Sequence, residues 1–179
     1  MKELSLHILD IAQNSITAGA NLVEMVVTED ILANTLSISI TDNGKGMSRE
    51  FLKKVRDPFT TTRTTRGVGM GISLFESAAL SCDGSFDITS ELGIGTKVIA
   101  QFSHNHIDRQ PLGNIAETIT TLIFGNPTLD FVYKYNLNGG TFEFDTRLIK
   151  ETLSGAPIDT YEVILWIKEY INEGILELK

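Results

Sequence analysis

The sequence predicts an α+β protein, with a two-layer α/β sandwich followed by a small C-terminal α+β unit. Residues 4–18 place apolar side chains at the spacing of an amphipathic helix. Residues 36–41 alternate apolar and polar side chains, as a half-buried strand does. Residues 85–90 and 96–102 predict two further strands joined by a glycine-rich turn. Strands on one side and helices on the other form two layers around a shared core.

The first expected helix, residues 4–18, carries a polar stripe beside its apolar face. Asp10 and Asn14 are four residues apart and therefore share one helix face, and His7 lies one turn earlier. The commoner reason for such a stripe is a solvated polar face. The functional interpretation is a magnesium site, because Mg²⁺ takes oxygen ligands such as the Asn14 amide oxygen and shares them with substrate phosphates.

The segment after strand 36–41 reads Asp-Asn-Gly-Lys-Gly-Met over residues 42–47. Strand 36–41 is expected to pair with the preceding strand, residues 21–28. The Asp-Asn-Gly sequence that follows strand 36–41 is by itself typical of a hairpin turn. The next residues favour another interpretation, because residues 48–55 read as a helix with Ser48 as its N-cap. The strand is then expected to lead into a helix through this loop.

The polar and glycine residues of this loop suit a flat heterocycle. Asp42, at the end of its strand, can accept a hydrogen bond from an exocyclic amine such as N6 of adenine. Gly44 and Gly46 allow the backbone to approach a ring closely.

Three glycines at alternate positions, Gly67, Gly69 and Gly71, open an expected apolar helix over residues 68–81. Such a run places backbone N–H groups and the positive end of a helix dipole against an anion, normally a phosphate. By itself it equally fits a flexible turn before a helix. Together with the two polar motifs upstream, it favours a nucleotide.

These motifs, in this order, resemble the GHKL superfamily of ATP-binding domains, which is shared by gyrase, the heat-shock chaperone, histidine kinases and mismatch-repair ATPases. The matching segments are Asp10–Ala18 (N box), Asp42–Gly46 (first glycine box), Asp57–Phe59 (F box), Gly67–Gly71 (second glycine box) and Gly93–Thr96 (Gly-Thr element). Several boxes in register make chance improbable. The resemblance implies a sandwich of the GHKL (Bergerat) type over residues 1–105. Within the family, the sequence Pro-Phe-Thr-Thr-Thr-Arg over residues 58–63 is most similar to the histidine-kinase branch.

The resemblance also implies the cofactors ATP and Mg²⁺ and a role for each matching residue. Asn14 would ligate Mg²⁺ and Asp42 would hold adenine. The other cofactor-binding residues that it implies are Gly44 and Gly46 beside the base, Thr96 supporting the base through Asp42 or a water, Phe59 of the F box, Gly67, Gly69 and Gly71 facing the triphosphate, and Arg63 and Arg66 of a lid over residues 60–66. Arginine suits phosphate because its guanidinium matches planar oxyanion groups.

Two positions depart from the family pattern. Asp10 stands where hydrolytic branches and serine-kinase anti-sigma factors have Glu and histidine kinases have an amide. A carboxylate there can act as a general base, so Asp10 is the catalytic candidate, and the alternative is that it only orients a water of the metal shell. Thr17 stands where the family often has a basic residue. His7, inside the helix, is expected to be a packed residue and not a phosphoacceptor.

The C-terminal segment, residues 111–179, lies outside the resemblance and is predicted to form its own small unit. It reads as a helix over 112–124, a hairpin of strands 129–136 and 141–145, and a helix over 161–173 that is N-capped by Asp159 and ends at Gly174. Apolar and aromatic residues of the last helix are expected to pack on the hairpin, and the alternative is a partner-docking surface. The set is Val163, Leu165, Trp166 and Tyr170.

Composition narrows the possible partners. The formal net charge of −8 argues against nucleic acid, because phosphate backbones require a basic face. No segment is long and apolar enough to span a bilayer and no signal peptide is visible, so no membrane partner is expected. The single cysteine, Cys82, excludes an internal disulfide and fits a reducing, cytoplasmic compartment.

Two classes of function are consistent with the sequence. In the first, the protein hydrolyses ATP or transfers its γ-phosphoryl group to a Ser, Thr or His of a partner protein, as a kinase-related regulator. In the second, it is a non-catalytic, ATP-responsive binding module, in which ATP orders the lid and the C-terminal unit engages a partner. Asp10 favours the first class, and Thr17 favours the second. The resemblance also favours the second class, because a histidine kinase carries its phosphoacceptor His on a long helix before the N box, and no such helix is expected here.

Overall fold

A computed structural model describes residues 2–57 and 70–179. In chain order the elements are α1 (Leu4–Thr17), β1 (Leu22–Asp30), β2 (Thr35–Asp42), α2 (Arg49–Arg56), α3 (Met70–Leu80), β3 (Ser85–Glu91), β4 (Gly95–Ser103), α4 (Ile115–Gly125), β5 (Asp130–Leu137), β6 (Gly140–Asp145), α5 (Thr146–Leu153) and α6 (Tyr161–Leu178).

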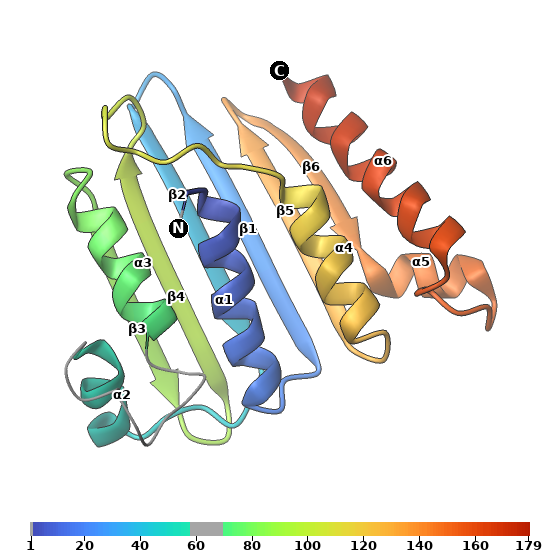
Figure 1. Cartoon of the computed structure of the whole chain (residues 1–179), viewed down its shortest axis with the longest axis horizontal. Coiled ribbons are helices and arrows are strands. Elements are labelled where there is room, and N and C mark those ends of the chain that lie inside the picture. Colours follow the sequence, from blue (N-terminus) through green and yellow to red (C-terminus); the bar gives the residue numbers. More distant parts are fainter. Residues whose placement is uncertain (1, 58–69) are drawn as a thin grey trace.

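The described strands form one six-stranded sheet in the order β3-β4-β2-β1-β5-β6. Strands β1 and β5 are parallel, and the other neighbouring pairs are antiparallel. Figure 1 shows α3, α1 and α4 side by side on one face of this sheet. The predicted two-layer α/β sandwich is therefore confirmed.

The alternation of the strands decides which face meets the helices. In β1, the side chains of Val23, Met25 and Val27 are fully buried. Glu24 and Thr28, at alternate positions, lie on the opposite face of the sheet and are only partly buried. The same period of two recurs in the neighbouring strands, because side chains alternate across a pleated sheet. The buried side chains of the sheet that meet the helices include Leu36, Ile38, Ile40, Val98, Ala100, Phe102, Phe131, Tyr133 and Tyr135.

Helix α1 lies over the middle of the sheet, and the connection after β4 holds its N-terminal end. The first N–H groups of a helix have no partner within the helix. Here the carbonyl oxygens of Pro111 and Leu112 accept hydrogen bonds from the N–H groups of Leu4 and Ser5, at 2.9 Å each. In Figure 1 this connection crosses the sheet at the end where α1 begins. The beginning of the C-terminal segment, residues 111–179, thus satisfies N–H groups at the start of α1.

The C-terminal segment contributes to the same sheet. Its hairpin forms as predicted, and β5 pairs in parallel with β1 from Leu22 opposite Asp130 to Glu29 opposite Leu137. Helix α4 packs on α1 and α6. The segment 111–179 therefore extends the sandwich of the first 105 residues, and its division into a unit of its own stays a prediction.

Three details of the C-terminal prediction differ from the structure. Helix α5 was not predicted. The N-cap of α6 is Thr160, whose hydroxyl accepts from the Val163 N–H, and not Asp159 one residue earlier. Helix α6 continues past Gly174 to Leu178, because that glycine serves close packing. A Cβ at Gly174 would clash with the ring of Phe142.

Within residues 2–57 and 70–179, none of the helices combines the length and the apolar character that crossing a bilayer requires. The long helix α6, for example, carries carboxylates such as Glu162, Glu169 and Glu173 along its length.

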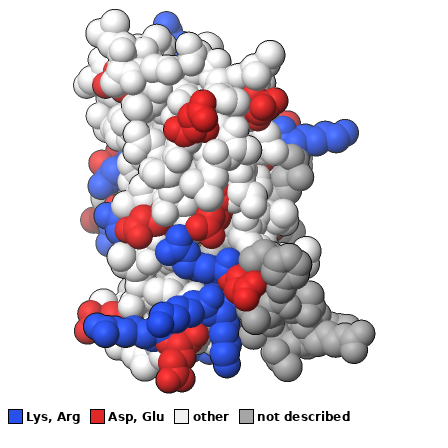
Figure 2. Space-filling view, turned by 90° about the vertical axis from the view of Figure 1, so that its left-hand side faces the viewer, with Lys and Arg blue, Asp and Glu red and all other residues white. Residues whose placement is uncertain are grey.

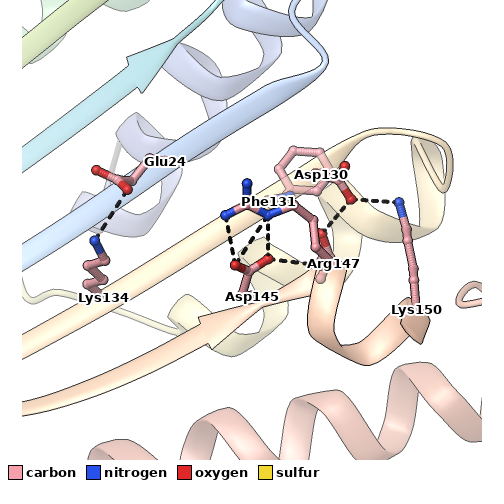
Figure 3. Close-up of polar contacts among 8 residues, drawn as sticks. Glu24, Asp130, Phe131, Lys134, Asp145, Arg147 and Lys150 are labelled. Atoms are coloured by element: carbon pink, nitrogen blue, oxygen red, sulfur yellow. Dashed lines mark hydrogen bonds and ion pairs between the residues drawn. The ribbon is translucent and has the colours of Figure 1, made fainter. Parts of the chain in front are cut away.

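A group of polar contacts joins β5, β6 and α5 (Figure 3). Thr146, which is fully buried, accepts a hydrogen bond from the Phe131 N–H at 2.9 Å and donates one to Asp130 Oδ1 at 3.2 Å. Lys150 Nζ lies 3.0 Å from the same carboxylate oxygen. Further along, Lys134 and Glu24 pair across β5 and β1 at 3.4 Å. These contacts fix where α5 leaves the sheet.

Replacing Thr146 by Val tests this junction. The variant keeps the shape of the side chain but leaves the buried Phe131 N–H without its acceptor. We expect the free energy of unfolding to fall by about 1–3 kcal/mol, measured by urea denaturation. Thr152→Val, on the exposed side of α5, is the matched control and should change stability by less than about 0.5 kcal/mol. Equal effects of the two substitutions would contradict the assigned role.

Candidate functional site

A cavity opens between α1, β2, β4 and the helices α2 and α3. Its floor and walls combine apolar side chains with a few polar groups from α1 and the ends of the strands. The lining residues are Ile11, Asn14, Ser15, Thr17, Ala18, Ile40, Asp42, Lys45, Gly46, Met47, Phe51, Ile72, Thr96 and Val98. Four of the predicted site residues, Asn14, Asp42, Gly46 and Thr96, are among them.

Asp42, the last residue of β2, is held in place by two hydrogen bonds. The hydroxyl of Ser15 on α1 donates to Asp42 Oδ2 at 2.7 Å, and the N–H of Gly44 donates to Oδ1 at 2.8 Å. Each carboxylate oxygen can accept more than one hydrogen bond. Asp42 thus presents a fixed acceptor at a largely apolar cavity.

The loop after Asp42 is not a hairpin turn, since β2 lies between β1 and β4 and the loop leads to α2. Asn43 anchors it, because its Oδ1 accepts from the N–H groups of Asn21 and Leu22 at 3.0 and 3.1 Å. Gly46 has φ of +70°, and a Cβ there would clash with the carbonyl oxygen of Glu91. This position requires glycine for both reasons.

Thr96 lies at the start of β4, opposite Asp42 in the pairing of β2 and β4. Its hydroxyl is 2.8 Å from the hydroxyl of Ser90 on β3, and Ser90 Oγ also accepts from the Met47 N–H at 2.8 Å. Ser90 therefore connects the wall formed by Met47 with the predicted residue Thr96.

Asn14 and Asp10 lie on one face of α1, as predicted, and α3 begins against them. A Cβ at Gly71 would lie 3.2 Å from Asp10 Cβ and 3.9 Å from Asn14 Nδ2. Among the described residues Asn14 Nδ2 is buried without a hydrogen-bond partner. A buried amide atom without a partner is rare in a protein interior and therefore calls for an explanation.

Burial shapes the ionisation of the polar stripe. It raises the pKa of the Asp10 carboxyl above its ordinary value of 3.8, although His7 opposes this shift. Burial also lowers the pKa of His7 below 6.5, against the effect of its hydrogen bond to Gln110 Oε1. The ring of His7 stacks on Phe75 at 5.2 Å. His7 is thus a packed residue of the core, as the sequence predicts.

Five predicted site residues lie outside the described residues, namely Phe59, Arg63, Arg66, Gly67 and Gly69, together with the predicted lid over residues 60–66. Gly44 is described and contributes its N–H to Asp42.

The side of the molecule around α2 is rich in basic residues. Figure 2 shows Lys and Arg side chains gathered in its lower part. Helix α2 carries Arg49, Lys53, Lys54 and Arg56. Arg56 pairs with Glu76 of α3 at 2.7 Å, so at least this charge serves the packing of two helices.

The sequence analysis missed several residues that build the cavity. Ser15 and Ser90 carry no motif of their own, and their role depends on hydrogen bonds across elements. The apolar walls, Ile11, Ile40 and Val98, look like ordinary core positions in the sequence. A signal for Ser15 was its place directly after Asn14, on a helix face that otherwise reads as buried.

The comparison with known families agrees with the geometry of this cavity. Residues 2–106 match the family described as histidine kinase-, DNA gyrase B- and HSP90-like ATPases. The match spans more than half of the chain, and the chain therefore belongs to this family.

Individual relatives in the comparison include a sensor protein and a kinase. A putative sensor protein of Shewanella frigidimarina is 33% identical over 99 residues, which are 54% of this chain and 15% of the relative. Sporulation kinase D of Bacillus subtilis is 31% identical over 91 residues, which are 51% of this chain and 18% of the relative. The chain thus spans less than a fifth of these relatives, and it carries an ATP-binding domain of the histidine-kinase type.

A solved structure supports the fold beyond the family segment. The ATPase domain of Aquifex aeolicus MutL, complexed with ADP, matches with a TM-score of 0.55 at 14% identity and covers 86% of this chain and 70% of that chain. The likeness in fold therefore includes part of the C-terminal segment.

The raised pKa of Asp10 predicts a pH-dependent effect of Asp10→Asn. A carboxyl whose pKa is higher in the folded state contributes stability below its unfolded pKa, and loses it as pH rises through the folded pKa. The neutral amide escapes this loss. We expect the variant to have a higher free energy of unfolding than the wild type at pH 7. The difference should shrink as pH falls through the folded pKa, and it should be largely gone at a pH below the ordinary value of 3.8.

Urea denaturation at pH 7 and at a pH below 3.8 measures this difference in the free energy of unfolding. Asp87→Asn is the control, because Asp87 is exposed on β3 and its carboxylate stays in water in both states. A gain at Asp10 that is the same at both pH values would contradict the explanation by burial.

Proposed function

We propose that this chain binds ATP with Mg²⁺ in the cavity between α1, β2 and β4, and passes the γ-phosphoryl group to water or to a Ser, Thr or His of a partner protein. The observation that carries the proposal is Asp42. It is a fixed carboxylate, hydrogen-bonded to Ser15 and Gly44, in a largely apolar cavity. Such a cavity suits a flat apolar ring with one amine donor, as in adenine.

The residues around Asp42 fit the base. Ile11, Ile40 and Val98 supply apolar walls, and Asp42 supplies the acceptor for an exocyclic amine. The Thr96 hydroxyl, held by Ser90, lies beside this carboxylate in the sheet and would support the base directly or through a water. Removing Asp42 would therefore cost the site its main polar recognition element.

The residues further along α1 fit a metal-bound phosphate group. Asn14 has a buried amide atom without a partner, and rotation of this amide presents its oxygen, a ligand type that Mg²⁺ accepts. The metal would supply charge stabilisation at the phosphate oxygens. Gly71, against Asp10 and Asn14, brings the start of α3 to the same place, where a helix N-terminus favours an anion.

Asp10 would act as the general base toward water or a hydroxyl group. It lies one turn from Asn14 on the same face of α1, and burial raises its pKa, which makes its carboxylate a stronger base at neutral pH. The names of the relatives, a sensor protein and a sporulation kinase, support a role in signal transduction. We place the protein in the cytoplasm, since its one cysteine, Cys82, is free and buried.

A second candidate function is a non-catalytic module that responds to ATP. The observation that favours it is Thr17, which lines the cavity at the position where the family often has a basic residue. In this function the predicted lid, residues 60–66, and the C-terminal segment would engage a partner in response to nucleotide binding. The two functions differ in the fate of the γ-phosphate.

Asp42→Asn tests the base. The amide cannot accept from the exocyclic amine as the carboxylate does, and its own N–H groups oppose the Ser15 hydroxyl or the Gly44 N–H. We expect ATP affinity, measured by isothermal titration calorimetry, to fall by about tenfold or more. Asp87→Asn removes the same charge far from the cavity and should leave the affinity unchanged. Unaltered affinity of Asp42→Asn would remove the assigned role of Asp42.

The γ-phosphate test uses γ-labelled ATP with the wild type, Asp10→Asn and Asn14→Ala. If Asp10 is the general base, Asp10→Asn should lower phosphate release or transfer by about 100-fold or more while nucleotide binding is retained. Asn14→Ala should remove the gain in ATP affinity that Mg²⁺ gives to the wild type. This second measurement is independent of turnover.

The outcomes separate the two functions. Release or transfer of label that is lost in Asp10→Asn supports the enzyme. Turnover of Asp10→Asn equal to that of the wild type would overturn the general-base role. Label that stays on bound ATP, with and without candidate acceptor proteins, favours the ATP-responsive module.

A further inference from the structure

A second hollow lies between α5 and α6, outside the segment that matches the family. It is a groove of about 300 Å³, lined by Ile149, Thr152, Leu153, Glu162, Val163 and Trp166. Most of its walls are apolar. In Figure 1, α5 and α6 lie at the edge of the sheet farthest from α3, and the groove shares no lining residue with the nucleotide cavity.

The aromatic wall of this groove is held in place on one side and open on the other. Trp166 is 50% exposed, and its ring stacks on Tyr170 with centroids 5.1 Å apart. Tyr170 in turn contacts Phe142 and Phe144 of β6, at 5.5 and 6.4 Å. A large exposed ring that is already positioned loses little conformational freedom on binding, which is typical of interface residues that contribute much of the affinity.

Carboxylates surround this ring. One stripe of α6 carries, at helical spacing, Glu162, Trp166, Glu169 and Glu173. Glu162 also lines the groove. All three carboxylates are exposed, and none of them forms an ion pair with another described residue. Residues 111–179 carry 10 acidic and only 5 basic side chains.

The basic residues of α5 and α6 are already paired with carboxylates. Arg147 pairs with Asp145 at 2.8 Å. Lys150 Nζ bonds with the Leu129 carbonyl and the Asp130 carboxylate, at 2.8 and 3.0 Å. Lys168 pairs with Glu117 of α4 at 3.9 Å. The field at the mouth of the groove is therefore negative.

From these observations we propose that the groove between α5 and α6 binds a cationic amphipathic segment of a partner protein. One apolar side chain of the segment enters between Leu153 and Val163. Lysine or arginine side chains meet Glu162, Glu169 and Glu173, and one of them lies over the face of Trp166, where a cation is attracted by the ring. The proposal identifies how the partner in the proposed function is recognised, and in that respect it rests on that function.

Charge complementarity selects this occupant over a second copy of the chain. In a two-fold symmetric dimer the same patch meets itself. Two acidic stripes would then face each other and repel. The anionic surface of a membrane would be repelled for the same reason.

Trp166 provides a local probe, because it is the only tryptophan of the chain. The test ligand is a synthetic peptide of about 18 residues, enough for about five helical turns, with leucines at helical spacing and lysines elsewhere. We expect a blue shift of the Trp166 emission and protection from acrylamide quenching on titration. A peptide with Glu in place of every Lys, and one with Ala in place of every Leu, should bind at least about tenfold more weakly.

Substitutions in the protein test the stripe itself. Glu169→Lys combined with Glu173→Lys should weaken the binding of the lysine–leucine peptide by about tenfold or more, and added salt should reduce the difference. Asp87→Lys, at the opposite end of the sheet, makes the same kind of charge change and should leave the affinity unchanged. Far-UV circular dichroism and Tm verify that each variant folds. If the double variant does not fold, Glu162→Gln provides the same test with a single neutralised charge.

Each outcome decides the proposal. Binding that needs both the lysines and the leucines, and that the stripe variants weaken, supports it. Equal binding of the acidic and basic peptides, or no change at Trp166, overturns it. A concentration-dependent shift of Trp166 without peptide, with a dimer in analytical ultracentrifugation, would instead assign the groove to a second copy. ATP affinity, measured on the same samples, reports separately on the nucleotide cavity.

Discussion

The hydrogen bond between Ser15 and Asp42 joins the two parts of the molecule on which the nucleotide cavity depends. It ties α1 to the end of β2 at 2.7 Å, so that one element supplies Asn14 and the other supplies the acceptor. Because both elements are packed against the core, the two groups keep a fixed separation. Preorganised polar groups of this kind bind a ligand without first losing conformational freedom.

The position of α1 itself depends on residues outside the family segment. The carbonyl groups of Pro111 and Leu112 satisfy the N–H groups at its start, and α4 packs along its side. Strand β5 pairs with β1 on the side of the sheet away from β2. The C-terminal segment thus helps to hold α1, which carries Asn14, in its place on the sheet.

Both candidate sites retain groups that reduce stability in the free protein. Burial disfavours the charged form of Asp10, and Asn14 has a buried atom without a partner among the described residues. At the other end of the sheet, Trp166 stays half exposed and three carboxylates crowd one helix face. Such destabilising groups are expected at binding sites, where a ligand can pair with them or cover them. Binding of the ligand then stabilises the folded state.

The sequence by itself determined the described helices and strands of the first 105 residues, because helical and strand periodicity and capping are local properties. It also singled out four of the residues that line the cavity, Asn14, Asp42, Gly46 and Thr96. Asp10 and Asn14 share a helix face through their spacing alone. Only the tertiary structure decided that the C-terminal hairpin extends the same sheet, since β1 and β5 are separated by about a hundred residues and no local pattern specifies a parallel partner. It also decided that Gly174 lies inside α6, where Phe142 leaves no room for a side chain, and that Ser15 holds Asp42.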